Sequence, residues 1–118
     1  MRGDEERVIH AFCAYLTQQG WTITREVEFV DVLAEKDGHR IFAEAKGRTS
    51  SPGLDVDTMF GQLLRRMGPE RPGPETRFAA VVPTGAAGKV ERVPAWVREE
   101  LRIDLYVVDD DGSVSQRR

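Results

Sequence analysis

Two short apolar runs in the first half of the chain, joined by a turn, most constrain its fold. Phe29–Ala34 and Ile41–Lys46 each have the length of a strand, and Asp37-Gly38 between them is typical of a hairpin turn. Successive side chains of a strand point to opposite faces, so Glu44 and Lys46 share one face and the two neighbouring alanines share the other. We therefore expect an antiparallel strand pair with charged side chains on one face.

Three charged residues, Asp31, Glu44 and Lys46, interrupt these apolar runs. A charge in such a strand is costly without a partner. Two converging carboxylates repel each other unless a cation lies between them, and carboxylate oxygens are the ligands that Mg²⁺ prefers. A neighbouring ammonium group can then hold a metal-bound water or help to deprotonate it, an arrangement suited to phosphodiester hydrolysis. With 20 acidic and 17 basic residues, the chain also produces this spacing by chance, so an ordinary exposed Glu–Lys pair is the alternative.

Length and composition fit a single domain over residues 1–118. The chain is 40% hydrophobic and 31% charged, as is usual for a globular protein. No apolar stretch approaches the roughly 20 residues that span a bilayer, and the first residues lack the apolar segment of a secretory signal. Cys13 is the only cysteine, so no internal disulfide can form. We therefore expect a cytoplasmic protein without membrane contact.

The net charge of −3 argues against a broad basic surface for nucleic acid. A local basic groove remains compatible with it, because the carboxylates of a metal site themselves lower the net charge. Binding to nucleic acid is then expected to be weak and sensitive to salt unless a partner supplies positive charge.

The patterned segments predict the order α-β-β-β-α-β-α-β, a mixed sheet flanked by helices. The expected helices are Asp4–Gln19, Asp55–Met67 and Val93–Leu101. The expected strands are Trp21–Glu28, Phe29–Glu35, Arg40–Lys46, Phe78–Val82 and Ile103–Val108. The last two strands enclose a helix, which predicts a parallel crossover. Gly47–Leu54 is expected to be a mobile loop, and the tail 109–118 either a short hairpin or a flexible segment.

Three further features receive structural interpretations. Gly85–Val90 resembles a phosphate loop but has too few residues between its glycines, and Val90 replaces the required Ser or Thr, so we expect a turn. Trp21 and Trp96 are expected to be packing anchors. The core stripe expected for the second helix is Val56, Phe60, Leu63, Leu64 and Met67.

At Asp31 and Glu44-Ala45-Lys46 the chain resembles the PD-(D/E)xK nuclease superfamily, which has the restriction-endonuclease-like fold. The motif of that family is an Asp near the start of one strand and Glu-x-Lys on the next, and these residues match it position by position. The resemblance implies an endonuclease that hydrolyses DNA in recombination, repair or restriction, with Mg²⁺ or Mn²⁺ as cofactor.

The resemblance also implies roles for single residues. Asp31 and Glu44 would ligate the metal together with the backbone carbonyl of Ala45, and Lys46 would position the attacking water. Relatives of the archaeal junction resolvases carry a Glu early in the first helix, and Glu5 fits that place. Glu5 would complete the metal shell or take a proton; alternatively it only stabilises the helix dipole.

The helix after the motif carries a polar residue in the same relatives, and Gln62 occupies that place. Gln62 would donate to a phosphate oxygen; alternatively it is a solvated helix residue. Arg48, Arg65 and Arg66 are candidates for contacts to the DNA backbone.

A fainter resemblance is to the fdxN-element excision controlling factors of cyanobacteria. The matching pieces are Gly20–Thr24, Ala34–Lys36, Phe60–Leu63, Ala80–Pro83 and Ile103–Asp109, whereas Gly47–Asp57 departs from the pattern. This likeness supports a fold more than an activity.

Two functions remain open at this point. The first is a nuclease acting on duplex or branched DNA, as a homodimer where both strands are cut. The second is a nuclease-fold subunit that binds DNA or a partner protein and is inactive alone, which the negative net charge favours.

Overall fold

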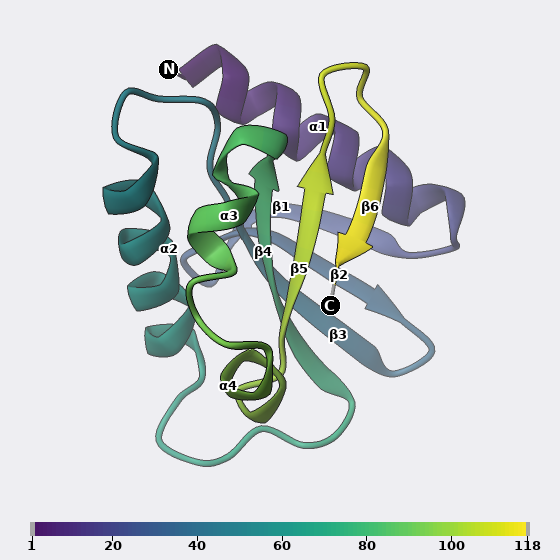
Figure 1. The fold of residues 1–118 in the computed structure, drawn as a ribbon. Coiled ribbons are helices and arrows are strands. Elements are labelled where there is room, and N and C mark those ends of the chain that lie inside the picture. The colour runs from purple at the N-terminus through teal and green to yellow at the C-terminus, as the bar shows by residue number, and fades with distance from the viewer. Residues whose placement is uncertain (1, 118) are drawn as a thin grey trace.

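Residues 2–117 are described in a computed structural model, in which six strands form one mixed sheet (Figure 1). The helices are α1 (Arg2–Gln18), α2 (Pro52–Arg66), α3 (Ala87–Val90) and α4 (Ala95–Glu100), with the 3-10 turn η1 (Thr84–Ala86) before α3. The strands are β1 (Thr22–Val27), β2 (Val30–Lys36), β3 (His39–Ala45), β4 (Thr76–Pro83), β5 (Ile103–Val108) and β6 (Val114–Arg117). The predicted mixed α/β fold with helices flanking a mixed sheet is confirmed.

The strands lie in the sheet in the order in which they occur along the chain. The pairs β1–β2, β2–β3 and β5–β6 are antiparallel, whereas β3–β4 and β4–β5 are parallel. The parallel crossover predicted between β4 and β5 is confirmed. The sheet gains β6 beyond the predicted order, so the hairpin alternative for the tail is correct as far as residue 117.

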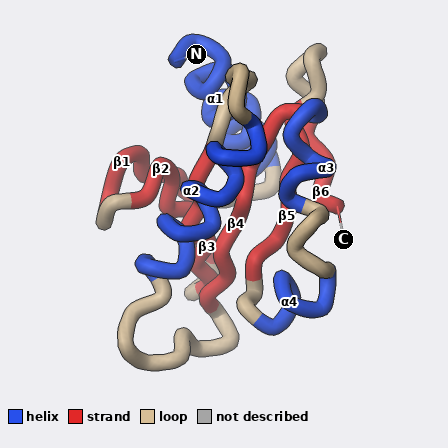
Figure 2. Tube along the Cα trace, turned by 60° about the vertical axis from the view of Figure 1, so that its left-hand side comes forward, coloured by secondary structure: helices blue, strands red, loops and turns tan. Residues whose placement is uncertain are grey.

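The two faces of the sheet are covered by different helices. Helix α1 covers one face, while α2 and α3 cover the other (Figures 1 and 2). Val8, Phe12 and Leu16 recur at helical spacing and are fully buried, which ties α1 to its face. After α1 the chain reverses at Gly20, whose φ of 93° suits glycine.

Both hairpins near the start of the sheet have two-residue turns with positive φ. The predicted Asp37-Gly38 turn is confirmed, with φ of 50° and 82°. The β1–β2 turn consists of Glu28 and Phe29, with φ of 52° and 64°, between the paired residues Val27 and Val30. The prediction that Phe29 begins a strand is therefore wrong, because the strand begins one residue later.

The helices on the second face differ from the prediction in detail. Helix α2 begins at Pro52, a residue suited to a first helical turn, so the predicted loop is shorter than expected. The segment predicted as a turn at Gly85–Val90 is helical, as η1 and α3. Trp96 on α4 is 72% exposed and is no packing anchor, whereas Trp21 packs against the core.

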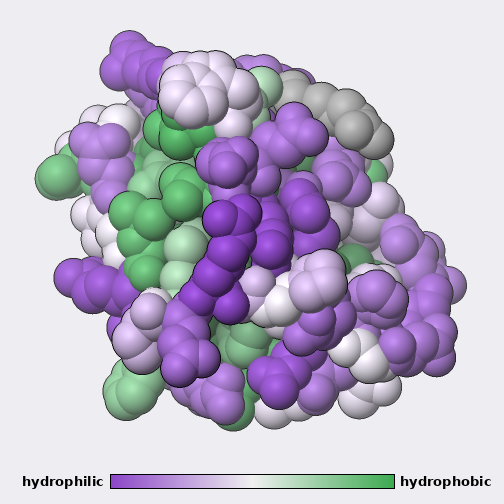
Figure 3. All heavy atoms as spheres, turned by 90° about the horizontal axis from the view of Figure 1, so that it is seen from below, coloured by the Kyte–Doolittle hydropathy of each residue, from purple (hydrophilic) through white to green (hydrophobic). Residues whose placement is uncertain are grey.

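A hollow lies at the amino ends of β4 and β5. Hydrophobic side chains gather in one area of the lower face of the molecule (Figure 3). Met67, Phe78 and Leu101 are among the residues that line a cavity of about 230 Å³ between the end of α2 and α4. Asp31 and Glu44 do not line it. Within residues 2–117, no helix is long and apolar enough to cross a membrane.

Candidate metal centre

The three motif residues come together at one end of the sheet. Glu44 lies near the carboxyl end of β3, and Lys46 follows that strand directly. Because β2 runs antiparallel to β3, Asp31 at the start of β2 lies beside the end of β3. Ligands of open α/β sheets bind at the carboxyl ends of the parallel strands, the end at which this cluster forms. We call Asp31, Glu44, Lys46 and the nearby Glu5 the candidate metal centre.

The backbone opens where this centre begins. Regular pairing of β2 with β3 ends with Val32 opposite Ala43. Beyond this pair, the backbone N–H of Ala45 donates to the side-chain Oδ2 of Asp31 at 2.8 Å. The half-buried Asp31 side chain thus takes the place of a backbone acceptor, and this bond fixes its carboxylate relative to β3.

Glu44 is buried without full compensation. Its side chain is 3% exposed, and Oε1 has no hydrogen-bond partner. Burial, the charge of Asp31 and a hydrogen bond with Asp31 raise the pKa of Glu44 to about 8, although Lys46 and Arg66 act in the opposite direction. Without a further cation, this site therefore favours a protonated carboxyl group at neutral pH.

The alternation of side chains predicted for β3 is confirmed. Ala43 and Ala45 belong to the core under α1, whereas Phe42 belongs to the core under α2. Glu44, two residues after Phe42, therefore faces α2, and its neighbour on β4 is the small residue Ala80. The acid is thus placed between the sheet and α2.

Glu5 reaches the centre from α1 because Gly47 allows a close approach. A Cβ atom at Gly47 would lie 2.3 Å from the backbone nitrogen of Glu5, so no side chain fits there. Burial and the charge of Asp31 raise the pKa of Glu5, while Lys46 lowers it. Glu6 points elsewhere and pairs with Arg25. Glu5 is thus the first-turn acid whose charge interacts with Asp31 and Lys46. Gly47, directly after the motif lysine, is the sequence feature that could have indicated this close approach of α1.

Helix α2 brings Gln62 and Arg66 to the same side. Both have a buried polar atom without a partner: Oε1 of Gln62 and Nε of Arg66. The prediction that Leu64 belongs to the core stripe is wrong, since it is 47% exposed, whereas Met59 is fully buried. The helix is therefore rotated so that the side with Gln62 and Met59 faces inward. Arg65 is exposed in the last turn.

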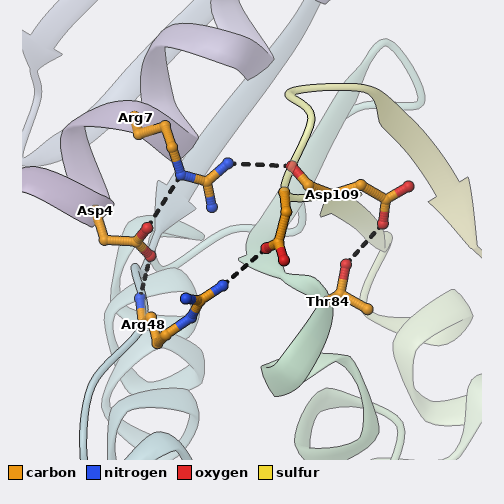
Figure 4. Close-up of polar contacts among 6 residues, drawn as sticks. Asp4, Arg7, Arg48, Thr84 and Asp109 are labelled. Atoms are coloured by element: carbon orange, nitrogen blue, oxygen red, sulfur yellow. Dashed lines mark hydrogen bonds and ion pairs between the residues drawn. The ribbon is translucent and has the colours of Figure 1, made fainter.

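Arg48 takes part in a polar network, drawn in Figure 4, rather than in the centre. The network consists of Asp4, Arg7, Arg48, Thr84, Asp109 and Asp110. Asp4 accepts from Arg7 Nε at 3.0 Å and from the backbone N–H of Arg48. Arg48 in turn pairs with Asp110 at 2.7 Å, and Arg7 donates to the backbone oxygen of Asp109 at 3.1 Å. These bonds join α1, the segment after β3 and the β5–β6 turn.

The acidic ligand set at the centre is small. Among residues 2–117, no three His, Cys, Asp or Glu side chains are grouped closely enough to hold a metal ion by themselves. Asp31 and Glu44 are the convergent pair, with an orphaned carboxylate oxygen on Glu44. Two carboxylates and a backbone carbonyl leave positions for water, which suits Mg²⁺ because that ion keeps several of its waters.

Comparison with known proteins shows the fold. No family model matches the chain, and no curated protein does so. An XisH family protein from Nostoc punctiforme PCC 73102 is similar over 95% of this chain and 99% of its own, with 22% identity and a TM-score of 0.63. An fdxN element excision controlling factor protein from Anabaena variabilis is similar over 94% and 97%, with 23% identity and a TM-score of 0.63. This agrees with the fainter of the two resemblances seen in the sequence.

Proposed function

We propose that this chain is a metal-dependent nuclease that hydrolyses DNA phosphodiester bonds. The observation that carries the proposal is the buried Glu44 carboxyl, which lies against Asp31 with one oxygen unpartnered and its pKa raised to about 8. A fold retains such a costly pair where a ligand repays the cost. A divalent cation between the two carboxylates would offset their repulsion and would coordinate the unpartnered oxygen of Glu44.

Each residue of the centre then has a role. Asp31, Glu44 and the carbonyl of Ala45 would hold Mg²⁺ or Mn²⁺, which would lower the pKa of a bound water and neutralise charge on the phosphate. The ammonium group of Lys46, whose charge acts on Glu44 and on Glu5, would orient the attacking water and stabilise its hydroxide form. Glu5 would accept a proton, because Asp31, Glu44 and Glu5 are not grouped closely enough to hold an ion together in the described structure.

Helix α2 would hold the phosphate. Arg66, whose charge acts on Glu44, has an unpartnered Nε that can donate to a phosphate oxygen. Gln62 would donate to a phosphate oxygen through its amide NH₂ group, because its unpartnered Oε1 is an acceptor. The exposed Arg65 would contact the DNA backbone further along. Arg48 is also assigned a backbone contact, although its guanidinium already pairs with Asp110.

One of the structurally similar proteins supports DNA as the substrate class. The similar protein from Anabaena variabilis is described as controlling the excision of an element, a term that points to DNA rearrangement. The full-length likeness supports the proposal that this chain also acts on DNA. Cutting both strands would require a homodimer, since one domain offers one such centre.

The test is cleavage of plasmid and branched DNA in Mg²⁺ or Mn²⁺. Asp31→Asn should abolish both cleavage and the uptake of metal measured by calorimetry. Asp57→Asn, at an exposed position on α2, should match the wild type. Equal cleavage by wild type and Asp31→Asn, or no metal uptake by the wild type, would contradict the proposal.

A second candidate is a nuclease-fold subunit that binds DNA or a partner protein and does not cut alone. The net charge of −3 and the small set of acidic ligands favour it. Metal uptake together with DNA binding, but with no cleavage in either metal, would select this candidate over the first.

A further inference from the structure

Phe29 is the most exposed large hydrophobic side chain in residues 2–117. It is 89% exposed, compared with 72% for Trp96 and 67% for Leu54. Its ring therefore adds almost nothing to the core, and a folded-state packing role does not account for a phenylalanine at this position.

The backbone at Phe29 is also unfavourable for this residue. Both Glu28 and Phe29 have positive φ, as two-residue hairpin turns of this kind require. Asn-Gly and Asp-Gly are the pairs that tolerate this conformation, and the other hairpin does use Asp37-Gly38. The β1–β2 turn instead accepts strain to carry a bulky aromatic side chain at its tip. Strain of this kind is concentrated at functional sites.

The ring lies next to the candidate metal centre. Phe29 precedes Asp31 by two residues, so their Cα atoms are at most about 7 Å apart. The guanidinium of Arg66 lies over the ring, 5.2 Å from its centroid. Arg66 also acts electrostatically on Glu44 and has an unpartnered Nε. Phe29 and Arg66 therefore lie beside the carboxylates of the candidate metal centre.

We propose that Phe29 is a stacking platform for an unpaired base, and that the substrate class is DNA with single-stranded segments such as gaps, forks and branches. The inference rests on the proposed function, since it places the stacked nucleotide beside the phosphate at the centre. In continuous duplex both faces of each base are covered by neighbours, whereas an unpaired base exposes a face to an aromatic ring. Arg66 would contact the adjacent phosphate through Nε.

The charge of the chain supports this mode of binding. With a net charge of −3, the protein gains little from general attraction to phosphates. Stacking on an aromatic ring supplies affinity that does not depend on counterion release and is tolerant of sequence. A single exposed ring next to the centre is thus a source of affinity that the overall charge does not provide.

The test measures binding rather than cleavage, by fluorescence anisotropy with a labelled duplex and with the same duplex containing a single-stranded gap. Titrations are run in EDTA and again in Ca²⁺ with the wild type, Phe29→Ala, Phe29→Trp and Phe29→Leu. Trp96→Ala removes another highly exposed aromatic group elsewhere and serves as the matched control. The high exposure of both side chains means that each variant should keep the wild-type melting temperature.

The wild type should prefer gapped DNA, and Phe29→Ala should lower affinity for it about tenfold while leaving duplex affinity nearly unchanged. Phe29→Trp should retain the preference, whereas Phe29→Leu should lose most of it. Equal losses on both DNAs, an equal loss in Trp96→Ala, full retention in Phe29→Leu or no binding of gapped DNA by the wild type would each overturn the inference.

Cleavage assays on the same duplex and gapped DNA in Mg²⁺, run beside the binding titrations, separate this inference from the proposed function. A Phe29-dependent preference without any cleavage supports the inference and contradicts hydrolysis. Cleavage of duplex and gapped DNA at equal rates by wild type and Phe29→Ala supports hydrolysis and contradicts the inference.

Discussion

The candidate metal centre and the polar network lie side by side, yet they satisfy their charges to very different degrees. Residues close together in the chain are divided between them. Asp4 belongs to the network and Glu5 to the centre, and Arg48 belongs to the network and Lys46 to the centre. In the network, Asp4 has two donors and Arg48 pairs with Asp110. In the centre, an oxygen of the buried Glu44 has no partner.

The difference indicates a division of labour. The network joins α1, the segment after β3 and the β5–β6 turn, so that a fixed backbone surrounds the centre. Within the network, Nη2 of Arg7 is the only buried side-chain atom without a partner among the described residues. The centre keeps unpaired lone pairs, which cost stability and are available to a ligand. Four experiments test this contrast.

The largest effect is expected on catalysis, from two basic residues separated by one position. Lys46→Ala should lower the rate of cleavage by about 100-fold or more, because it removes the group beside the attacking water. Arg48→Ala should weaken DNA binding and reduce its salt dependence, with a nearly unchanged rate at saturating DNA. Steady-state cleavage assays at several salt concentrations measure both. Equal losses of maximal rate in the two variants would show that the division between the regions is wrong.

The largest effect on stability is expected at the glycine between those residues. Gly47→Ala places a Cβ against the backbone of Glu5 and should cost about 2 kcal/mol of unfolding free energy in urea. Gly61→Ala on α2 is the matched control, since nothing lies within 4 Å of its added Cβ. The control should gain about 0.5–1 kcal/mol from helix propensity. A neutral Gly47→Ala would mean that α1 does not need this close approach.

The stability contribution of Glu44, the buried acid of the centre, is expected to depend on pH. Because the pKa of Glu44 is raised from 4.5 to about 8, the unfolded chain releases its proton first, and the stability contribution of this group falls as the pH rises between those values. In EDTA, Glu44→Gln should therefore gain about 1–2 kcal/mol over the wild type at pH 8 and almost nothing at pH 4. Urea titrations across this range measure the gain. A constant difference at all pH values would place the origin of the effect outside Glu44 ionisation.

The smallest effect is expected from the acid of the network. Burial favours the protonated form of Asp4, but hydrogen bonds from the Arg48 backbone and from Arg7 outweigh it and lower the pKa of Asp4. The stability contribution is then present above the ordinary pKa of an aspartate and is lost as the pH falls through the lowered value. Asp4→Asn should cost about 1 kcal/mol at pH 7 and little near pH 2, again by urea titration. A stability cost of Asp4→Asn that increases as the pH falls would contradict the lowered pKa of Asp4.

The strand portion of the centre could be predicted because it depends on local geometry. Alternation along a strand places Glu44 and Lys46 on one face regardless of the rest of the fold. The hairpin at Asp37-Gly38 likewise follows from residues that tolerate positive φ. Together these placed Asp31 near Glu44 before any tertiary information was available. Their roles in chemistry, and that of Gln62, stay predictions.

The rest depends on contacts that no local pattern encodes. The β1–β2 turn lacks the usual residues, so the sequence did not reveal the exposed position of Phe29. The rotation of α2 is set by packing on the sheet, which buries Met59 and exposes Leu64 contrary to the helical pattern. The role of Gly47 depends on α1, more than forty positions earlier in the chain. Only the three-dimensional arrangement shows where these residues lie.

The packing of α1 has a consequence for the order of events during synthesis. Its core contacts include Tyr106 and Val108 of β5, with Phe12 and Tyr106 rings 5.0 Å apart. At ordinary translation rates, roughly 5–20 seconds separate the emergence of the first helix from that of these partners. Until then Glu5 has no fixed place beside Asp31. We therefore expect the candidate metal centre of a ribosome-bound nascent chain to be completed only when β5, the last parallel strand, docks.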